Sequence, residues 1–258
     1  MWFPPETPEQ LQRIRQLKQK IVFNCPECHG SRIIEHDDLV VECKCFKRFE
    51  RFAYYVLANL PEETWIQTLD SYLKRGGDEE VAKTVQEFIF RFELFYRNGV
   101  GPLFWGGYAK GKTTLACIIA KAAIEKEVMA YFYPVSELVD DMVKREGRWG
   151  EIDRAEFIVE NVPLLVLDDF GKEDRDIRRN LDVKIRVKMD KILRARTSRR
   201  LLTIGSTNLD AGNAQELYGA SVFSVVQSSL KFINVKGQDL RIGVANAKWR
   251  QIMELPND

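Results

Sequence analysis

One stretch of this chain has the composition and spacing of a phosphate-binding loop. The segment GGYAKGKT follows the pattern G-x-x-x-x-G-K-[S/T] in full, and it lies between an apolar run, PLFW, and a helix-like run, TTLACIIAKAAI. Glycines let backbone N–H groups curl around phosphate oxygens, and the helix N-terminus adds a favourable dipole. We therefore expect a nucleotide phosphate to bind through Gly106, Gly107, Tyr108, Ala109, Lys110, Gly111, Lys112, Thr113 and Thr114.

Two residues of this loop offer chemistry beyond that of the backbone. Lys112 can reach the β- and γ-phosphates of ATP, and the hydroxyl of Thr113 can ligate Mg²⁺. A glycine-rich turn can match the pattern by chance, but here the required strand and helix flank the motif on both sides. ATP and Mg²⁺ are the predicted cofactors.

A pair of acids follows the apolar strand in PLLVLDDFG. This strand delivers Asp168 to the C-terminal edge of the sheet, where ligands bind in open α/β sheets. We expect Asp168 to hold Mg²⁺, directly or through water, and Asp169 to polarise the attacking water as a general base. The alternative is a buried strand that ends in two solvated acids, and Asp169 can also simply cap the next segment.

A third strand, in RLLTIGSTN, ends at Thr207 and Asn208. We predict that Asn208 lies beside the phosphate loop, where it senses the γ-phosphate or orients water. Asparagine after a strand is also ordinary turn chemistry, so the prediction depends on the place of this strand in the order of the sheet.

Four of the five cysteines lie within the 21 residues of CPECHGSRIIEHDDLVVECKC. Two thiolate pairs, each on a tight turn and joined by a hairpin-like segment, suit the tetrahedral shell of Zn²⁺. A redox pair would open a helix on a βαβ unit, which is not the context here, and thiols stay reduced in the cytoplasm. We expect a closed, structural zinc site formed by Cys25, Cys28, Cys43 and Cys45.

Three other readings of the cysteine segment remain open. His29 or His36 can replace one cysteine as a ligand, the cluster can hold iron and sulfur, or the thiols can be free. The fifth cysteine, Cys117, falls on the helix after the phosphate loop and is interpreted as a small core residue.

These signatures need a scaffold, and the second half of the chain predicts one. Apolar strands in GPLFWGG, VMAYFYP, PLLVLDD and RLLTIGSTN alternate with helical segments. Near-continuous apolar strands in a βαβα rhythm indicate a parallel sheet with helices on both faces. The fold class is therefore α/β.

The first hundred residues predict helices on either side of the cysteine segment. Helical spacing of apolar residues indicates helices over 6–20, 47–60 and about 78–97. The stretch YLKRGGDEE has the composition of a linker. We predict a zinc-binding, partner-docking domain over 1–60, a linker over 61–77 and an ATPase domain over 78–258.

Composition excludes several classes of protein. Apolar residues make up 45% and charged residues 30% of the 258 residues, as in ordinary soluble globular proteins, and the formal net charge is only +1. No apolar run approaches the roughly 18 residues of a transmembrane helix, and the N-terminus lacks the apolar core of a signal peptide. We expect a cytoplasmic protein without a membrane partner.

Two local basic runs, 184–191 and 194–200, are candidate DNA contacts, although a charge run is usually a solvated face. Phe170, beside the paired acids, is a candidate for stacking on bases, although such aromatics are more often core residues.

The phosphate loop, the paired acids and the asparagine turn together resemble the AAA+ ATPases of the DnaC/DnaI helicase-loader and IstB group. The phrases that carry the resemblance are LFWGGYAKGKTTLACIIAKAA, AYFYPVSELVDDM, LLVLDDFGKE and LLTIGSTNL, and it covers about residues 60–245. It implies a P-loop AAA+ core with a five-stranded parallel sheet in the order 5-1-4-3-2 and a short helical lid. It also implies that Asn208 is the sensor 1 residue and that Arg241, in GQDLR, is the sensor 2 arginine.

The segment CPECHGSRII…VECKC is similar to the zinc module that DnaI and related phage loaders carry before the ATPase. This resemblance implies a bacterial or phage protein whose zinc module grips a ring-shaped replicative helicase. It further implies ATP bound between subunits of a hexamer or helical assembly, and single-stranded DNA as the place where the helicase is loaded.

The chain departs from this group in one segment. Family members carry a pattern like Y-G-x-R-V-x-S-R-L, in which an arginine reaches the neighbour's ATP, whereas this chain has YGASVFSVVQSSL. Ser221 and Val225 stand where arginines are expected. Either another arginine substitutes, with Arg199, Arg200 and Arg241 as candidates, or hydrolysis is slow.

Three functions are consistent with these features. The first is an ATP-dependent loader of a replicative helicase onto single-stranded DNA during replication initiation. The second is a transposition regulator like IstB, which binds duplex DNA and recruits a transposase; the zinc segment favours the first. The third is an ATP-switch adaptor with little hydrolysis, which the missing arginines favour.

Overall fold

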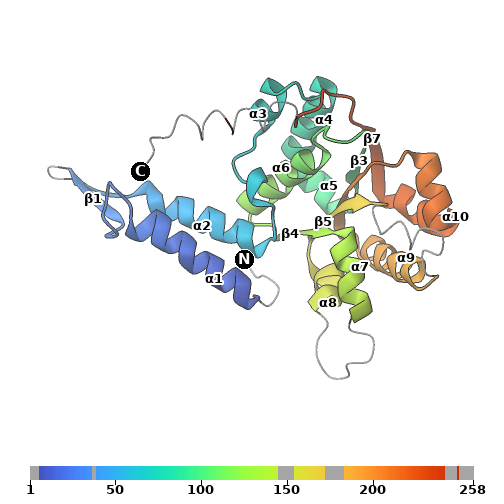
Figure 1. Cartoon of the computed structure of the whole chain (residues 1–258), viewed down its shortest axis with the longest axis horizontal. Helices are drawn as coiled ribbons and strands as arrows, with labels where there is room; N and C mark the ends of the chain where they lie inside the picture. The colour runs from blue at the N-terminus through green and yellow to red at the C-terminus, as the bar shows by residue number, and fades with distance from the viewer. Residues whose placement is uncertain (1–5, 37–38, 145–153, 172–182, 242–248, 250–258) are drawn as a thin grey trace.

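A five-stranded parallel sheet forms the centre of the molecule (Figure 1). The computed structural model describes residues 6–36, 39–144, 154–171, 183–241 and 249. The order of the strands is β4-β5-β6-β3-β7, which is the predicted order 5-1-4-3-2 read from the opposite edge, and the α/β prediction is confirmed. The strands are β3 (Gly101–Trp105), β4 (Ala130–Pro134), β5 (Leu164–Phe170), β6 (Leu202–Thr207) and β7 (Leu230–Asn234).

Helices cover both faces of this sheet, as the βαβα rhythm predicts. One face carries α4 (Glu79–Phe90), α5 (Phe92–Asn98) and α6 (Lys112–Glu125). The other face carries α7 (Val135–Lys144), α8 (Arg154–Asn161), α9 (Val183–Ser198) and α10 (Ala211–Ser229). The resemblance implies no residue range for the short helical lid, which stays a prediction.

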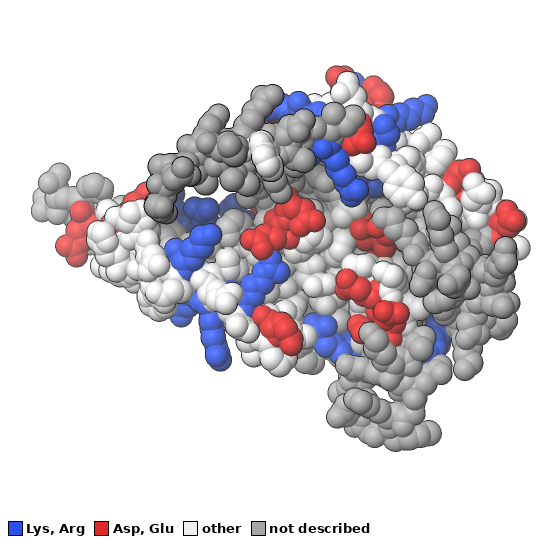
Figure 2. Space-filling view, viewed as in Figure 1, with Lys and Arg blue, Asp and Glu red and all other residues white. Residues whose placement is uncertain are grey.

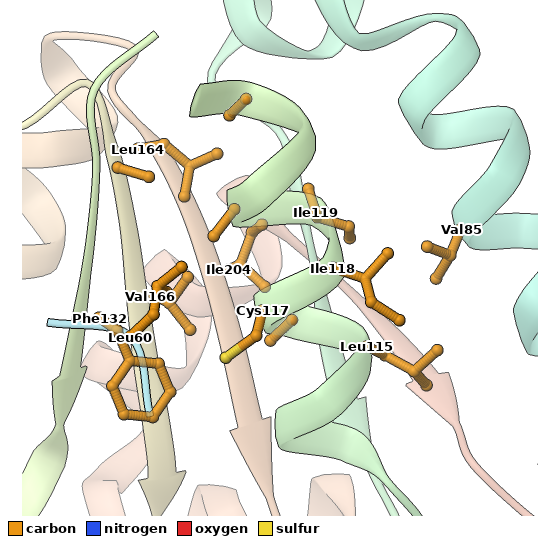
Figure 3. Packing of buried hydrophobic residues seen from close by; sticks show 14 of the residues in the cluster. Leu60, Val85, Leu115, Cys117, Ile118, Ile119, Phe132, Leu164, Val166 and Ile204 are labelled. Atoms are coloured by element: carbon orange, nitrogen blue, oxygen red, sulfur yellow. The ribbon is translucent and has the colours of Figure 1, made fainter. Parts of the chain in front are cut away.

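The helix after the phosphate loop, α6, is almost entirely buried because it lies between the sheet and α4. Figure 3 shows Cys117 directed toward the strands, where Val166 and Ile204 lie, while Ile118 faces Val85 of α4. Cys117 is fully buried, and burial raises the pKa of its thiol to about 12. The interpretation of Cys117 as a core residue is confirmed.

The N-terminal residues form a separate projection at the left of Figure 1. Its helices, α1 (Pro8–Lys18) and α2 (Lys44–Leu57), pack side by side, and a π-helical turn, η1 (Gln19–Phe23), follows α1. Between them lies the antiparallel hairpin of β1 (Ile33–His36) and β2 (Leu39–Glu42), which the sequence predicts. Thr7 and Gln10 form a capping box that fixes the start of α1.

The C-terminal end of α2 enters the core that surrounds the parallel sheet and covers one edge of that sheet. The backbone N–H of Phe132, on the edge strand β4, donates to Ala58 O at 2.8 Å, and Asn59 Nδ2 donates to Phe132 O at 3.0 Å. The next residues form η2 (Glu62–Thr64) and α3 (Leu69–Lys74). The region predicted as a linker thus contains helical turns that contact the core, and the domain boundaries stay a prediction.

The helix predicted over 78–97 is interrupted. The backbone of Arg91 leaves the helical region, with φ −95° and ψ 21°, so α4 ends at Phe90 and α5 begins at Phe92. The break accompanies an aromatic cluster in which Phe95 stacks on Phe88, with 4.4 Å between the ring centroids. Periodicity alone cannot reveal such a break, because both segments keep helical spacing.

The interpretation of run 194–200 as a solvated or DNA-contacting face is wrong for Arg196. Its side chain is 1% exposed, and burial lowers its pKa to about 9. The guanidinium donates to Thr203 Oγ1 and to the carbonyl oxygens of Val159, Val162, Pro163 and Leu202. Arg196 therefore ties α9 to the chain segments that enter β5 and β6.

No helix among the described residues is long and apolar enough to cross a membrane.

A second buried cation joins α6 to the region after α2. Lys121 is 7% exposed, and its Nζ donates to the carbonyl oxygens of Thr64, Trp65 and Gln67. Burial lowers the pKa of Lys121 to about 8. These hydrogen bonds fix residues 64–67 against the helix that follows the phosphate loop.

We expect Lys121→Ala to lower the free energy of unfolding by about 2–4 kcal/mol, because three buried carbonyl groups lose their donor. Lys126→Ala, at the exposed end of the same helix, should change it by less than about 0.5 kcal/mol. Urea denaturation of the two variants measures the difference. Equal effects of the two substitutions would contradict a structural role for Lys121.

Candidate functional site: a nucleotide site at the carboxyl edge of the sheet

The predicted phosphate loop connects the end of β3 to the start of α6. Gly106 has φ +140°, and a Cβ atom there would lie 2.5 Å from Val235 O. Gly111 has φ +82°, and a Cβ atom would lie 2.7 Å from both Tyr72 and Leu240. Only glycine fits either position without displacing its neighbours, so the two outer glycines of the motif set the shape of the loop.

Lys112, the lysine of the motif, bridges the loop and the end of β6. Its Nζ donates to Gly106 O at 3.0 Å, Gly107 O at 2.7 Å and Asn208 Oδ1 at 2.8 Å. The structure therefore brings Asn208 beside the phosphate loop, as its place in the strand order predicts. The lysine is 6% exposed, so its charge is held inside the loop.

The threonine of the motif and the first acid of the pair meet at the same edge. Thr113 Oγ1 lies 3.0 and 3.1 Å from the two carboxylate oxygens of Asp168. Asp168 is 6% exposed, at the end of a strand that is otherwise buried. This hydroxyl–carboxylate pair joins the first turn of α6 to β5.

A buried serine that the sequence analysis did not single out organises both acids. Ser206 Oγ donates to Asp168 Oδ1 and accepts the backbone N–H of Asp169 at 3.0 Å. The backbone of Asp169 is left-handed, with φ +63°, at an irregularity in the pairing of β5 with β6. A non-glycine residue there is strained, so the hydrogen bond from its N–H to Ser206 helps to hold the turn. The only available signal was the serine in the STN turn.

The residues at this edge fit a nucleotide with its magnesium ion. The oxygens of Thr113 and Asp168 are hard donors of the kind that Mg²⁺ prefers, and they already lie together. Nδ2 of Asn208 is buried without a hydrogen-bond partner among the described residues, as expected of a donor whose acceptor arrives with the ligand. Lys112 supplies the positive charge for phosphate.

A second unpredicted residue, Tyr72 of α3, packs over the loop from the side of the N-terminal region. It is 1% exposed; its hydroxyl accepts the N–H of Asp78 at 2.9 Å and lies 3.4 Å from Lys110 O. On the same side, the N–H of Leu240 donates to Ala109 O at 2.9 Å. The loop is thus held by segments that lie far from it in the sequence.

Comparison with protein families decides the classification. The model of the family described as IstB-like ATP binding protein matches residues 36–185, more than half of the chain. The chain belongs to this family. The matched residues include the phosphate loop and both acids, so nucleotide binding by an AAA+ core follows from the family and from the site together. A search of the curated proteins found no match.

Solved structures of replication proteins share the fold. The DnaC helicase loader is 24% identical, with a TM-score of 0.57, over 68% of this chain and 100% of that one. DnaI is 19% identical, with a TM-score of 0.54, over 68% and 94% of the two chains. AMPPCP-bound DnaA from Aquifex aeolicus is 15% identical, with a TM-score of 0.54, over 77% and 58%. At these identities the likeness establishes the AAA+ fold.

The positions where the group's arginines are expected have other surroundings in this IstB-like chain. Val225 belongs to α10, is 8% exposed and packs in the core between that helix and the sheet. Ser221 is exposed, and its Oγ accepts a hydrogen bond from Arg194 Nη2 at 2.8 Å. The three candidate substitutes, Arg199, Arg200 and Arg241, are all exposed, and Arg199 also donates to Glu160 O at 2.9 Å. Phe170 is buried and packs in the core, so its alternative role in base stacking is not supported.

The four clustered cysteines converge as predicted. Their sulfur atoms all lie within 4.8 Å of one another, with 3.7 Å between Cys25 and Cys43 and 3.5 Å between Cys28 and Cys45. A tetrahedral zinc ion with Zn–S bonds of about 2.3 Å would separate its sulfurs by about 3.8 Å. Each cysteine is a free thiol. The set therefore fits one zinc ion, and a disulfide is excluded among the described cysteines.

Of the two histidines, only His29 can be compared with this set. His29 is exposed and is not part of the cluster, and the side chain of His36 lies outside the described residues. Burial opposes ionisation of Cys28, but hydrogen bonds from the backbones of Arg32 and Gly30 outweigh it and lower the pKa of Cys28 to about 7. Burial raises the pKa of Cys45, so the thiols ionise unequally by themselves, and a bound ion would favour the thiolate form of all four.

We expect Ser206→Ala to raise the Mg²⁺ concentration needed for half-maximal ATP turnover and to lower turnover by about tenfold or more, the usual effect of losing a partner of a metal ligand. Ser229→Ala is the matched control, because Ser229 is equally buried but bonds to Val225 O, away from the acids. Ser206→Thr, which keeps the hydroxyl, should retain most of the activity. An unchanged Mg²⁺ dependence in Ser206→Ala would refute the role given to the serine.

We expect the purified chain to contain about one zinc ion, the content of a single four-thiolate site. Atomic absorption should show that Cys25→Ser combined with Cys28→Ser removes it, whereas Cys117→Ala does not. Fluorescence binding of an ATP analogue should be unaffected by the double substitution. Joint loss of zinc and ATP binding would instead mean that the metal stabilises the whole chain.

Proposed function

We propose that this chain is an ATP-dependent loader of a ring-shaped replicative helicase onto single-stranded DNA during replication initiation. One observation carries the choice among AAA+ functions: a cysteine module projects from the ATPase core and exposes a large apolar surface. Leu39, Val40 and Val41 of β2 are 70%, 65% and 46% exposed, and Ile33 of β1 is 44% exposed. We call these four residues the apolar hairpin.

The apolar hairpin is suited to insert into a groove on a protein partner. Successive residues of a strand point to opposite faces, so Leu39 and Val41 face one side and Val40 the other. An apolar surface of this kind on a soluble protein marks an interaction site. Zinc would hold the base of the hairpin rigid while leaving its strands available. A helicase is the partner implied by the resemblance to the loaders.

At the nucleotide site, each residue takes the role for which its geometry suits it. Lys112 exchanges its carbonyl and amide acceptors for the β- and γ-phosphates of ATP. Thr113 and Asp168 hold Mg²⁺, which neutralises charge on the phosphates when bound. Asp169 accepts a proton from the attacking water, and Asn208 donates its unpartnered Nδ2–H to the γ-phosphate. Arg241 is the proposed second contact to the nucleotide.

Assembly completes the proposed site. ATP is expected at the interface between copies of this chain in a hexamer or helical assembly, where an arginine of the neighbour would stabilise the transition state. Because Ser221 and Val225 replace the usual arginines, hydrolysis by the chain alone should be slow. An ATP-switch adaptor is the alternative favoured by this observation.

The family favours a second alternative, a transposition regulator like IstB.

We expect the wild-type chain to capture a replicative helicase from its host and to transfer it to a single-stranded gap in the presence of ATP. Lys112→Ala should abolish ATP binding and transfer. Helicase pull-down and loading on gapped DNA measure the two steps, and capture of a transposase in place of a helicase would favour the regulator.

Leu39→Ser combined with Val40→Ser should weaken helicase capture by about tenfold or more, because each buried apolar side chain contributes roughly 1.5–3 kcal/mol. Phe90→Ser is the control, since Phe90 is 82% exposed on α4, away from the hairpin. Both variants should bind ATP normally.

Helicase transfer that continues with a non-hydrolysable ATP analogue would support the switch adaptor.

A further inference from the structure

Four cations of the basic runs that the sequence offers for DNA binding have partners within the fold or are buried. Acidic side chains and backbone carbonyl groups neutralise or bury several of their cations on α9. Lys191 pairs with Glu156 at 3.2 Å, Arg194 with Asp190 at 2.7 Å and Arg199 with Glu160 at 3.6 Å, while Arg196 is buried. The pair of Lys191 with Glu156 is exposed and therefore weak, so α9 is kept as a comparison in the test below, while the buried Arg196 is removed from any contact with a polyanion.

A different surface presents basic residues in register. On α2, Lys44, Lys47, Arg48 and Arg51 follow the spacing i, i+3, i+4 and i+7, which places them along one side of the helix. All four are exposed. We call these four residues the basic stripe. Figure 2 shows Lys and Arg side chains gathered at the left, over the α1–α2 pair.

The basic stripe keeps most of its charge available. Lys47 lies 3.5 Å from Glu42, but both side chains are more than half exposed, so the pair is weak. Lys44, Arg48 and Arg51 make no ion pair with any residue in the part of the chain that the structure describes. The only acid on α2, Glu50, follows Lys47 by three residues and therefore lies beside the Lys47 end of the stripe, not along Lys44, Arg48 and Arg51.

The stripe has the character of a polyanion contact and not of a protein interface. Among the described residues, α2 contributes no exposed large apolar side chain. The centre of a protein–protein interface is usually apolar and depleted of charged residues, so this side of α2 differs from such an interface. Seven residues of helix span about 10.5 Å, so the stripe presents a cation every ~3.5 Å. One strand of DNA carries a phosphate every ~3.4 Å along a duplex.

We propose that the basic stripe of α2 binds the phosphate backbone of DNA. This proposal rests on the proposed function in one respect, that DNA is a partner, and it adds the surface that makes the contact. The N-terminal projection would then carry two separate contacts: the basic stripe of α2 for DNA and the apolar hairpin of β1 and β2 for a protein.

Fluorescence anisotropy with a labelled oligo(dT) strand, and with a duplex of equal length, tests the proposal. The variant combines Lys44→Gln, Arg48→Gln and Arg51→Gln, all exposed, so folding should be preserved. The control combines Lys74→Gln, Lys83→Gln and Arg97→Gln, which removes the same charge from α3, α4 and α5. A second comparison combines Lys191→Gln and Arg194→Gln. Melting temperature and ATP binding are measured for each.

The α2 variant should lose about tenfold or more in affinity at low salt. The slope of log K against log salt for the single strand should become shallower by about 2, since each phosphate contact contributes roughly 0.7. The control should keep the wild-type slope. The two DNA forms report whether the stripe prefers single strands or duplex.

Four results would overturn the proposal. One is wild-type affinity and slope in the α2 variant, and another is an equal loss in the control, which would reduce the effect to net charge. The third is loss of helicase capture with DNA binding intact, which would assign the stripe to an acidic protein. A wild-type chain that binds no oligonucleotide at low salt would refute DNA as a partner altogether, while ATP binding would remain to be judged by Lys112→Ala.

Discussion

The structure depends on the hydrogen bonds that fasten the first turn of α6 to the ends of β5 and β6. Thr113 contacts Asp168 and Lys112 contacts Asn208, so two neighbouring residues of one helix reach two different strands. Parallel strands bring their carboxyl ends to one edge, and the phosphate loop delivers the helix to that edge. The strand order and the backbone conformations of Gly106 and Gly111 together place the start of α6 beside the ends of β5 and β6. Ser206 extends the network by holding both acids from the adjacent strand.

Sequence patterns predict the parts of this site that are local in the chain. The phosphate loop, the acids after a buried strand and the four cysteines each have a spacing that follows directly from backbone geometry. The strand order 5-1-4-3-2 is implied by the resemblance to the DnaC/DnaI and IstB group and not by local spacing, and the structure confirms it. Asn208 could be placed because its strand neighbours β3 in that order.

The residues that sequence reasoning missed are those whose role depends on burial by distant segments. Arg196 reads as part of a solvated basic run, yet it donates to carbonyl groups more than thirty residues away. Lys121 looks like an ordinary surface lysine of a helix until residues 64–67 cover it. Ser206 and Tyr72 are unremarkable in type and acquire their roles only from what lies opposite them. Charged residues are exposed on average because burial removes their hydration. A cation can nevertheless be buried when enough carbonyl oxygens accept its hydrogen bonds and offset the loss of water.

The contact between Asn59 and Phe132 has a consequence for the integrity of the sheet. An unpaired strand edge is a template for pairing with another chain, and proteins protect such edges by covering them. Here the cover on β4 comes from the end of α2, so the helical pair shields the ATPase core as well as extending from it. Cleavage of the chain between the two parts would expose this edge strand. The residues at the end of α2 therefore protect the core from aggregation through the edge of its sheet.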